Sequence, residues 1–526
     1  MSVRRLLCIL LSLFLILSLA GCRSDTENSS SDIFSENSDA SARGYVNMLC
    51  CYADSFNPYT ASSEINRNLS RLIFDPILKL DNNYEVVYCL AESVALDGTV
   101  CTVKLKNTTF TDGTPLTASD VVYSYNLARG SSTIYASNLY EVSSVTAADT
   151  LTVVFNLTRH DPFFVKLLDF PILKTDSDKR TDIDDVVLPP IGGGRYYPSE
   201  DGTRLIRNDN YHGKIGEIPE IRLVNSPDAD SVSHYVEVGA TDFYYTDIAD
   251  GQIVRMSGQK TDINLNQLVY IGINHTYGQL GQRNMRYAIS SALDREEICS
   301  LAYYNNATPA NGFYPPYFKE TAPVQTLKSS ADMQITVENL EKIGYNSLNG
   351  QGYRVNSSGN SPSYTLLVNS ENRSRVAAAN RIASQLETAG IKIKVIEKSL
   401  ADYTAALQSG DFQLYLGEIR ILANMDMSGL VMTGGSAAYG IVKPQPLEDG
   451  TVPADNIADS ISALYSGNAT VPDTAGVLIT EMPVIPVCYR NGLLFSNNNI
   501  KLSSGEKISA SRSDIFLSAE DYVYKK

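Results

Sequence analysis

The stretch Asn107–Tyr125 reads NTTFTDGTPLTASDVVYSY. In the residues just before it, Thr99–Leu105, polar and apolar side chains alternate, as is typical of a strand with one buried face. Asp112-Gly113 supplies a turn with an accessible positive φ, and Thr117 followed by Asp120 has the arrangement of a helix capping box. The sequence therefore predicts a strand, a turn and a helix in immediate succession.

Length and composition point to a globular protein with more than one core. The chain has 526 residues, of which 43% are hydrophobic, so we expect two or three domains. Its formal net charge of −16 argues against nucleic acid and anionic lipid as partners, because both need Lys and Arg gathered on one face.

The N-terminus has the features of an export signal. Arg4-Arg5 precedes the apolar run Leu6–Leu19, which is too short for a comfortable membrane span. The run ends in Leu-Ala-Gly-Cys, the form of a lipobox in which the Cys22 thiol receives lipid; the alternative is an ordinary signal peptide with a chance cysteine. We expect a lipoprotein signal peptide at 1–22, a lipid anchor on Cys22 and, because large apolar residues are scarce there, a flexible tether at 23–43.

Six cysteines remain once Cys8 and Cys22 are assigned to the signal and the lipid. No pair has the spacing of a zinc site, and we expect most of them to be buried apolar residues. Cys89 and Cys101 are the first pair to test for a disulfide, because an even count outside the cell permits one.

The second half of the chain alternates between strand and helix patterns. The predicted helices are 375–389, ended by Gly390, and 401–409; the predicted strands are 364–369, 391–396 and 412–417. Such alternation indicates a parallel sheet with right-handed crossovers and with ligands at the carboxyl ends of its strands.

Several segments together resemble the bacterial extracellular solute-binding proteins of family 5, the peptide- and nickel-binding receptors of ABC importers. The opening stretch carries F-x-D-G-x-P-L-x-A-x-D-V-V-Y-S, and the other segments are Leu72–Leu78, Arg207–Gly213 and the predicted helix Arg286–Ile298. His212 stands where the family usually has Trp. The resemblance extends, in the order of the motifs, from Tyr45 to Tyr489.

The resemblance implies an α/β, two-lobed periplasmic-binding-protein-like fold of type II, in the large peptide-binding cluster, with an extra subdomain in the first lobe. Lobe I would comprise 44–268 and 481–526, with the extra subdomain at about 77–190, and lobe II would comprise 269–480. A helix is also expected to begin at Asp161-Pro162, with Asp as its cap.

The resemblance also suggests ligand-binding residues. In peptide-binding members an Asp in a G-W-x-x-D-Y-x-D-P segment pairs with the ligand's amino group, and the corresponding run here is Gly417–Met427, with Asp426 at the later Asp. We predict that the following residues line an interlobe cleft: Glu418, Arg420 and Asp426 on one side, and Ser62, Ser63 and Glu64 on the other. The alternative is that they are surface or salt-bridged residues of loops.

No catalytic, metal or cofactor motif accompanies this pattern: HExxH, G-x-S-x-G and Walker sequences are missing, and Gly192–Gly194 is not followed by Gly-Lys-Ser/Thr. The sequence predicts a monomeric, non-enzymatic receptor on the outer face of the cytoplasmic membrane, or in the periplasm. It would bind a small solute, most of all a peptide, and deliver it to an ABC permease. The alternatives are a non-transport peptide or signal sensor of the same fold and a secreted hydrolase.

Overall fold

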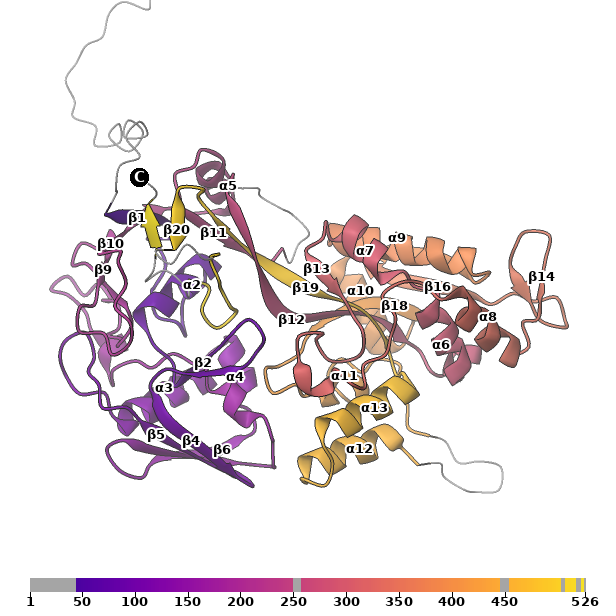
Figure 1. Ribbon diagram of the computed structural model, residues 1–526, viewed down its shortest axis with the longest axis horizontal. Helices are drawn as coiled ribbons and strands as arrows, with labels where there is room; N and C mark the ends of the chain where they lie inside the picture. The colour runs from indigo at the N-terminus through magenta and orange to yellow at the C-terminus, as the bar shows by residue number, and fades with distance from the viewer. Residues whose placement is uncertain (1–43, 249–256, 445–453, 503–506, 517–521, 525–526) are drawn as a thin grey trace, which may run out of the picture. The chain divides into compact units, whose positions relative to one another are not determined.

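A sheet of eleven strands organises the computed structural model, which describes residues 44–248, 257–444, 454–502, 507–516 and 522–524 (Figure 1). The predicted signal peptide, Cys22 and the tether 23–43 lie outside the described residues. The order of the strands is β17 (Lys392–Lys398), β16 (Ser363–Asn369), β18 (Leu414–Arg420), β12 (Gln259–Ile273), β19 (Ile485–Ser496), β11 (Phe243–Thr246), β1 (Tyr45–Cys50), β10 (Glu220–Asn225), β9 (Arg204–Arg207) and β8 (Tyr196–Pro198), with β13 (Ala307–Pro309) on β19.

The two longest strands connect the two ends of this sheet. β12 and β19 run antiparallel from the pair Gln259 and Ser496 to the pair Ile271 and Ile485. On their outer edges, β19 pairs with β11 and β12 pairs with β18. Both strands therefore belong to both halves of the sheet.

The alternation predicted for the second half of the chain is confirmed. β16 pairs in parallel with both β17 and β18, and the helices between them are α9 (Arg373–Thr388) and α10 (Leu400–Ser409). Ala379, Ile382 and Leu386 of α9 are buried against the sheet. Gly390 has a φ of 85° just after α9, a conformation that glycine adopts without the steric cost of a Cβ.

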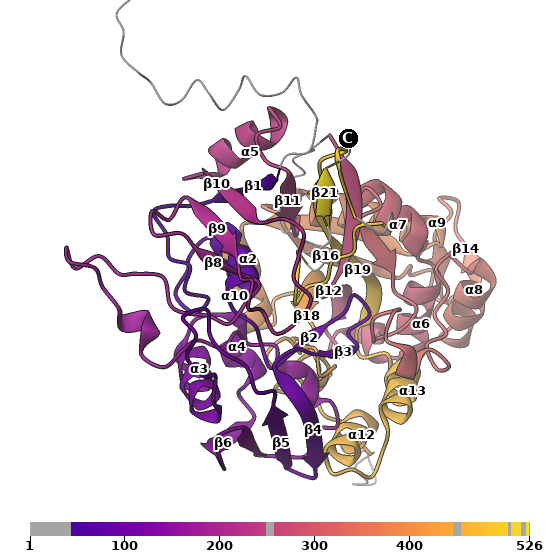
Figure 2. The ribbon, with the colours of Figure 1, turned by 60° about the vertical axis from the view of Figure 1, so that its left-hand side comes forward.

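The strand, turn and helix predicted from the opening stretch are also confirmed. β5 (Val100–Leu105) lies in an antiparallel sheet of order β4 (Ala91–Asp97), β5, β7 (Thr152–Leu157), β6 (Val142–Ala147), and α3 (Ala118–Gly130) packs beside β6 (Figure 2). Thr117 and Asp120 form the capping box at the start of α3. Asp120 also accepts hydrogen bonds from Thr175 N (2.9 Å) and Oγ1 (2.8 Å), so the cap fixes a distant loop as well.

Two predicted helices differ from the structure. Arg286–Ile298 is divided between α6 (Arg283–Ser291) and α7 (Arg295–Ala302), because Asp294 accepts a hydrogen bond from Glu297 N (2.8 Å) and starts a second helix. The helix expected after Asp161 is only a short 3-10 turn, Phe164–Leu167, since the chain soon leaves it to form the bridge between Pro171 and Pro76.

The remaining elements surround these sheets. The other helices are α2 (Glu64–Ile73), α4 (Ile134–Asn138), α5 (Ala229–Glu237), α8 (Met333–Lys342), α11 (Ser428–Val431), α12 (Asn456–Tyr465) and α13 (Val471–Glu481). The other strands form two-stranded antiparallel sheets: β2 (Leu78–Leu80) with β3 (Val86–Tyr88), β14 (Ser347–Leu348) with β15 (Arg354–Val355), and β20 (Ile500–Leu502) with β21 (Tyr522–Tyr524). Within the described ranges, no helix combines the length and the apolar character needed to cross a membrane.

The cysteines behave as the sequence predicts for buried apolar residues. All six in the described part of the chain are free thiols, and all except Cys51 are buried. Burial raises the pKa of Cys101 to about 12, so this thiol is not ionised near neutral pH. Cys89 and Cys101 are not joined by a disulfide in this structure.

Candidate ligand pocket

The N-terminal end of α2 is held by a network of local hydrogen bonds. Ser63 caps the helix by accepting from Asn66 N (3.2 Å), and Asp54 accepts from Ser62 N (3.1 Å) and Ser63 N (2.7 Å). These backbone bonds lower the pKa of Asp54, although burial, the largest single effect, acts in the opposite direction. The loop before α2 is therefore fixed, and Ser62 and Glu64 are positioned with it.

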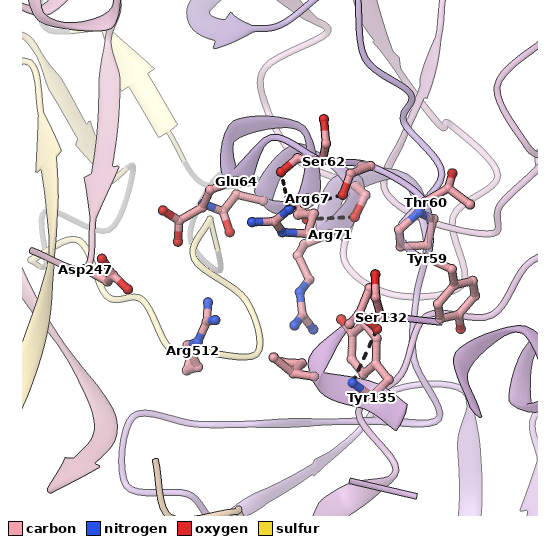
Figure 3. A pocket seen from close by; sticks show the side chains of 16 residues that line it. Tyr59, Thr60, Ser62, Glu64, Arg67, Arg71, Ser132, Tyr135, Asp247 and Arg512 are labelled. Carbon is pink, nitrogen blue, oxygen red and sulfur yellow. Dashed lines mark hydrogen bonds between the residues drawn. The ribbon is translucent and has the colours of Figure 1, made fainter. Parts of the chain in front are cut away.

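A cavity of about 640 Å³ lies against this end of α2 (Figure 3). The preceding loop, α2 and the start of α4 form most of its wall, and single side chains from distant segments complete it. Five charged residues line the cavity: Glu64, Arg67, Arg71, Asp247 and Arg512. Its volume lies within the range of small-molecule binding sites, and both signs of charge face the same space.

The arginines of this cavity differ in the number of hydrogen bonds that they make. Arg67 donates to the carbonyl oxygens of Ala61 (3.1 Å) and Ser62 (2.5 Å) and so supports the loop. Arg71 is only 7% exposed and makes one long hydrogen bond, to Asp169 O at 3.4 Å. Arg512 makes no hydrogen bond or ion pair with the described part of the chain, and its guanidinium points into the cavity like that of Arg71 (Figure 3).

The surroundings of Glu64 in the cavity disfavour its ionised form. Burial raises its pKa, and repulsion by Asp247 acts in the same direction, whereas Arg512 and Arg67 lower it. A cationic group of a ligand beside Glu64 would favour its ionised form and so offset part of the effect of burial on its pKa.

Glu418 and Arg420 both belong to β18 but have different surroundings. Glu418 is ion-paired with Arg490, whose Nη2 and Nε lie 2.6 and 2.8 Å from its Oε1. Arg420 donates from Nη2 to Asn138 Oδ1 (3.0 Å) and has Arg512 among its charged neighbours. Burial and then repulsion by Arg512 lower the pKa of Arg420, so Arg512, which lines the cavity, is one of its charged neighbours.

Asp426 is engaged by a residue from the other part of the fold. Its Oδ2 is 2.6 Å from Arg159 Nη2, and its Oδ1 accepts from Ser428 N at 2.8 Å. The guanidinium of Arg159 also lies over the ring of Tyr465, 3.6 Å from its centroid. Asp426 thus has a cationic partner within the chain.

Of the six predicted ligand-binding residues, Ser62 and Glu64 belong to the wall of the cavity. Arg420 does not line it, but Arg420 interacts electrostatically with Arg512, which does. Ser63 serves as the helix cap, and Glu418 and Asp426 are in ion pairs. Sequence reasoning missed Arg71, Asp247 and Arg512. Arg67 and Arg71, one helical turn apart after the Ser63 cap, are the only local signal that could have indicated a cationic wall.

A second polar cluster has ligand types that could hold a metal ion. One atom each from Asp75, Cys89 and His212 lie within 4.8 Å of one another. However, Asp75 already accepts from His212 Nε2 (2.7 Å) and is ion-paired with Lys79, whose Nζ lies 3.3 Å from its Oδ1. Because an ammonium group so close repels a second cation, we interpret this cluster as a buried hydrogen-bonded network.

Comparison with known proteins now decides the family. The family model described as bacterial extracellular solute-binding proteins, family 5 Middle, matches residues 85–440, more than half of the chain. The chain belongs to this family. The resemblance inferred from the sequence motifs is therefore confirmed, and the family-5 description makes its members extracellular solute-binding proteins rather than a family of enzymes.

Individual family-5 relatives are distant. Oligopeptide-binding protein AppA of Bacillus subtilis (strain 168) is 25% identical over 366 residues, which make up 64% of this chain and 66% of AppA. Among the first curated relatives, the matched region spans less than two thirds of each relative's length.

Solved structures confirm the predicted fold class. The ABC transporter substrate binding protein CtaP of Listeria monocytogenes has 20% identity and a TM-score of 0.66, covering 92% of this chain and all of CtaP. A nickel ABC transporter protein from Bacillus halodurans has 17% identity and a TM-score of 0.71, covering 91% of this chain and 99% of its own. The family-5 chain has the two-lobed, type II α/β fold of these binding proteins.

Proposed function

We propose that this family-5 protein is the receptor of an ABC importer, which binds a peptide between two lobes and delivers it to the permease. Lobe I would comprise 44–268 and 481–526, with the extra subdomain at about 77–190, and lobe II would comprise 269–480. The observation that carries the proposal is the cavity at α2, where Arg71 and Arg512 face the same space as Glu64 and Asp247.

A peptide fits this cavity because it carries both signs of charge. An uncompensated charge inside a closed cleft is costly, so the amino and carboxylate groups of a peptide need partners of opposite sign. Glu64 and Asp247 can receive the first and the arginines the second. A relative matched by sequence, AppA, is named for oligopeptide binding, which agrees with this ligand class.

The transport cycle needs no chemical step from the protein. Binding would select the closed arrangement of the lobes, because some ligand contacts exist only when both lobes meet. The monomer would release an unchanged ligand to the permease. A lipid on Cys22 and the tether 23–43 would keep it on the outer face of the cytoplasmic membrane, or in the periplasm.

The test is a thermal-shift screen of the full chain with peptides of different lengths, followed by native mass spectrometry of the protein as purified. A ligand at a hundredfold excess over its Kd stabilises the folded state by about 2.7 kcal/mol, which is readily measured. We expect stabilisation by a subset of peptides and recovery of the ligand intact. Steady cleavage of these peptides by the pure protein would refute the receptor and support the hydrolase alternative.

A further inference from the structure

Three arginines from separate parts of the chain converge beside the cavity. Arg71 belongs to α2, Arg420 to the end of β18, and Arg512 to the C-terminal segment. Arg71 lies 5.7 Å from the centroid of the Tyr135 ring, and Arg420 and Arg512 also interact electrostatically with Tyr135. Tyr84, on the neighbouring hairpin, is likewise close to Arg420 and Arg512.

Arginines outnumber carboxylates in the cavity and its surroundings: Arg67, Arg71, Arg420 and Arg512 stand against Glu64, Asp169 and Asp247. Asp169 is the carboxylate shared by Arg420 and Tyr135 as an electrostatic neighbour, and its Oδ2 accepts from Ser513 Oγ (3.2 Å). None of the three arginines forms an ion pair with a described residue, and Glu64 is the further carboxylate that interacts with Arg512. Counted together, the four arginines and three carboxylates leave an excess of one positive charge.

The hydrogen-bonding capacity of the three side chains is also largely unused. A guanidinium has five N–H donors. Arg71 uses one, at 3.4 Å, although the residue is only 7% exposed; Arg420 uses one, to Asn138; Arg512 uses none within the described part of the chain. The donors of Arg71 and Arg512 point into the cavity (Figure 3).

Charge balance then indicates the kind of group that fits. A single carboxylate brings one negative charge and two acceptor oxygens, which satisfy one guanidinium in a bidentate pair. The cavity's excess of one positive charge and the amino group of a bound peptide together make two positive charges. A group with two negative charges and several oxygens closely spaced would balance both charges and use the free donors.

We propose that the cavity recognises the dianionic end of its ligand, as in a short peptide ending in glutamate or aspartate, and that Arg71, Arg420 and Arg512 hold this end. The inference rests on the proposed receptor function and narrows its ligand class. A phosphate monoester shares the same chemistry, so the experiment must separate the two sources.

Isothermal titration calorimetry on the full chain tests the inference with matched probes. Tripeptides ending in Glu are compared with the same tripeptides ending in Gln, and glycerol phosphate is compared with glycerol. We expect the Glu peptides to bind at least tenfold more tightly, about 1.4 kcal/mol, than the Gln peptides. In Arg71→Gln and Arg512→Gln this preference should fall to less than threefold.

Two further variants separate recognition from folding. Arg71→Lys keeps the charge but loses the fork of donors, so it should retain part of the preference. Arg204→Gln removes an exposed guanidinium that pairs with Glu220; neither residue lines the cavity, so this variant should keep the full preference.

Each outcome decides between the two proposals. Equal affinity for Glu and Gln peptides, with no binding of glycerol phosphate, overturns the dianionic site and leaves the peptide receptor standing. Binding of glycerol phosphate without any peptide supports the dianionic site and overturns peptide as the ligand. If none of the probes binds, both proposals fail.

Discussion

Arg159, which follows β7, lies 2.6 Å from Asp426, which follows β18. Their side chains are 26% and 8% exposed, and Arg159 is also ion-paired with Glu141 at 2.9 Å. In the sequence Arg159 comes before β12 and Asp426 comes after it, so the contact joins two segments that are distant along the chain. The Asp that the family pattern suggests as a ligand anchor therefore has an intramolecular partner.

Asp426→Asn should lower the free energy of unfolding by about 1–3 kcal/mol. Removing one partner of a fully buried pair costs about 3–5 kcal/mol, and we expect less here because Arg159 keeps Glu141 and is partly exposed. Urea unfolding of Asp426→Asn, Arg159→Met and the double variant measures the coupling. Strictly additive single effects would mean that the pair contributes no interaction energy.

Whether Asp426 also binds ligand stays a prediction. If the ligand's amino group competes with Arg159 for this carboxylate, Asp426→Ala should weaken peptide binding at least tenfold in calorimetry, about 1.4 kcal/mol. A change of less than about threefold would remove Asp426 from the ligand site and leave it with the pairing role alone.

The pair Glu418–Arg490 should matter more for stability than for binding. Both side chains are nearly buried, at 10% and 5% exposure, so Glu418→Gln should cost about 3–5 kcal/mol by leaving Arg490 without its anion. The matched control is Glu92→Gln, which breaks the exposed pair with Lys104 and should cost no more than about 1 kcal/mol. Similar losses in the two variants, measured by chemical denaturation, would contradict this ranking.

The stability of the protein should fall on acidification through His275. Burial, and then repulsion by Arg286, lower its pKa from 6.5 to about 4, although the carbonyl oxygen of Pro483 at 2.8 Å acts in the opposite direction. Because the folded pKa lies below the unfolded one, the contribution of His275 is complete above about pH 6.5 and is lost as the pH falls toward 4.

At about 1.4 kcal/mol per pKa unit, this loss amounts to roughly 3 kcal/mol. Denaturation curves at several pH values, for the wild type and His275→Gln, isolate it as the difference between the two slopes. Parallel pH profiles for the two proteins would show that another group is responsible.

The two capping boxes of the fold allow a local and a tertiary contribution to be separated. Asp473 accepts only from Thr470 at the exposed start of α13, and Asp473→Ala should cost about 0.5–2 kcal/mol. Asp120 makes the same bonds to Thr117 and additional ones to Thr175. We expect Asp120→Ala to cost about 1–2 kcal/mol more than the control, because two further donors lose their acceptor. Equal losses in thermal unfolding would assign all of the effect to helix capping.

The sequence by itself determined the elements whose interactions are local. The strand, turn and capped helix around Asn107–Tyr125, the parallel strands β16–β18 and the end of α9 at Gly390 depend on residues a few positions apart, and all were predictable. The family motifs, read in order, also indicated the two-lobed fold. The division between α6 and α7 was missed, because the apolar spacing continues through Asp294 while its side chain caps a new helix.

Only the tertiary structure decided which charged groups meet. Arg71, Arg420 and Arg512 share no local pattern, and the folded chain makes all three of them electrostatic neighbours of Tyr135. In the same way Asp426 finds Arg159 across 267 positions of the chain. Helix periodicity and capping act over a few residues, whereas the field in a binding cavity is the sum over every segment that packs against it, and that sum exists only in the folded chain.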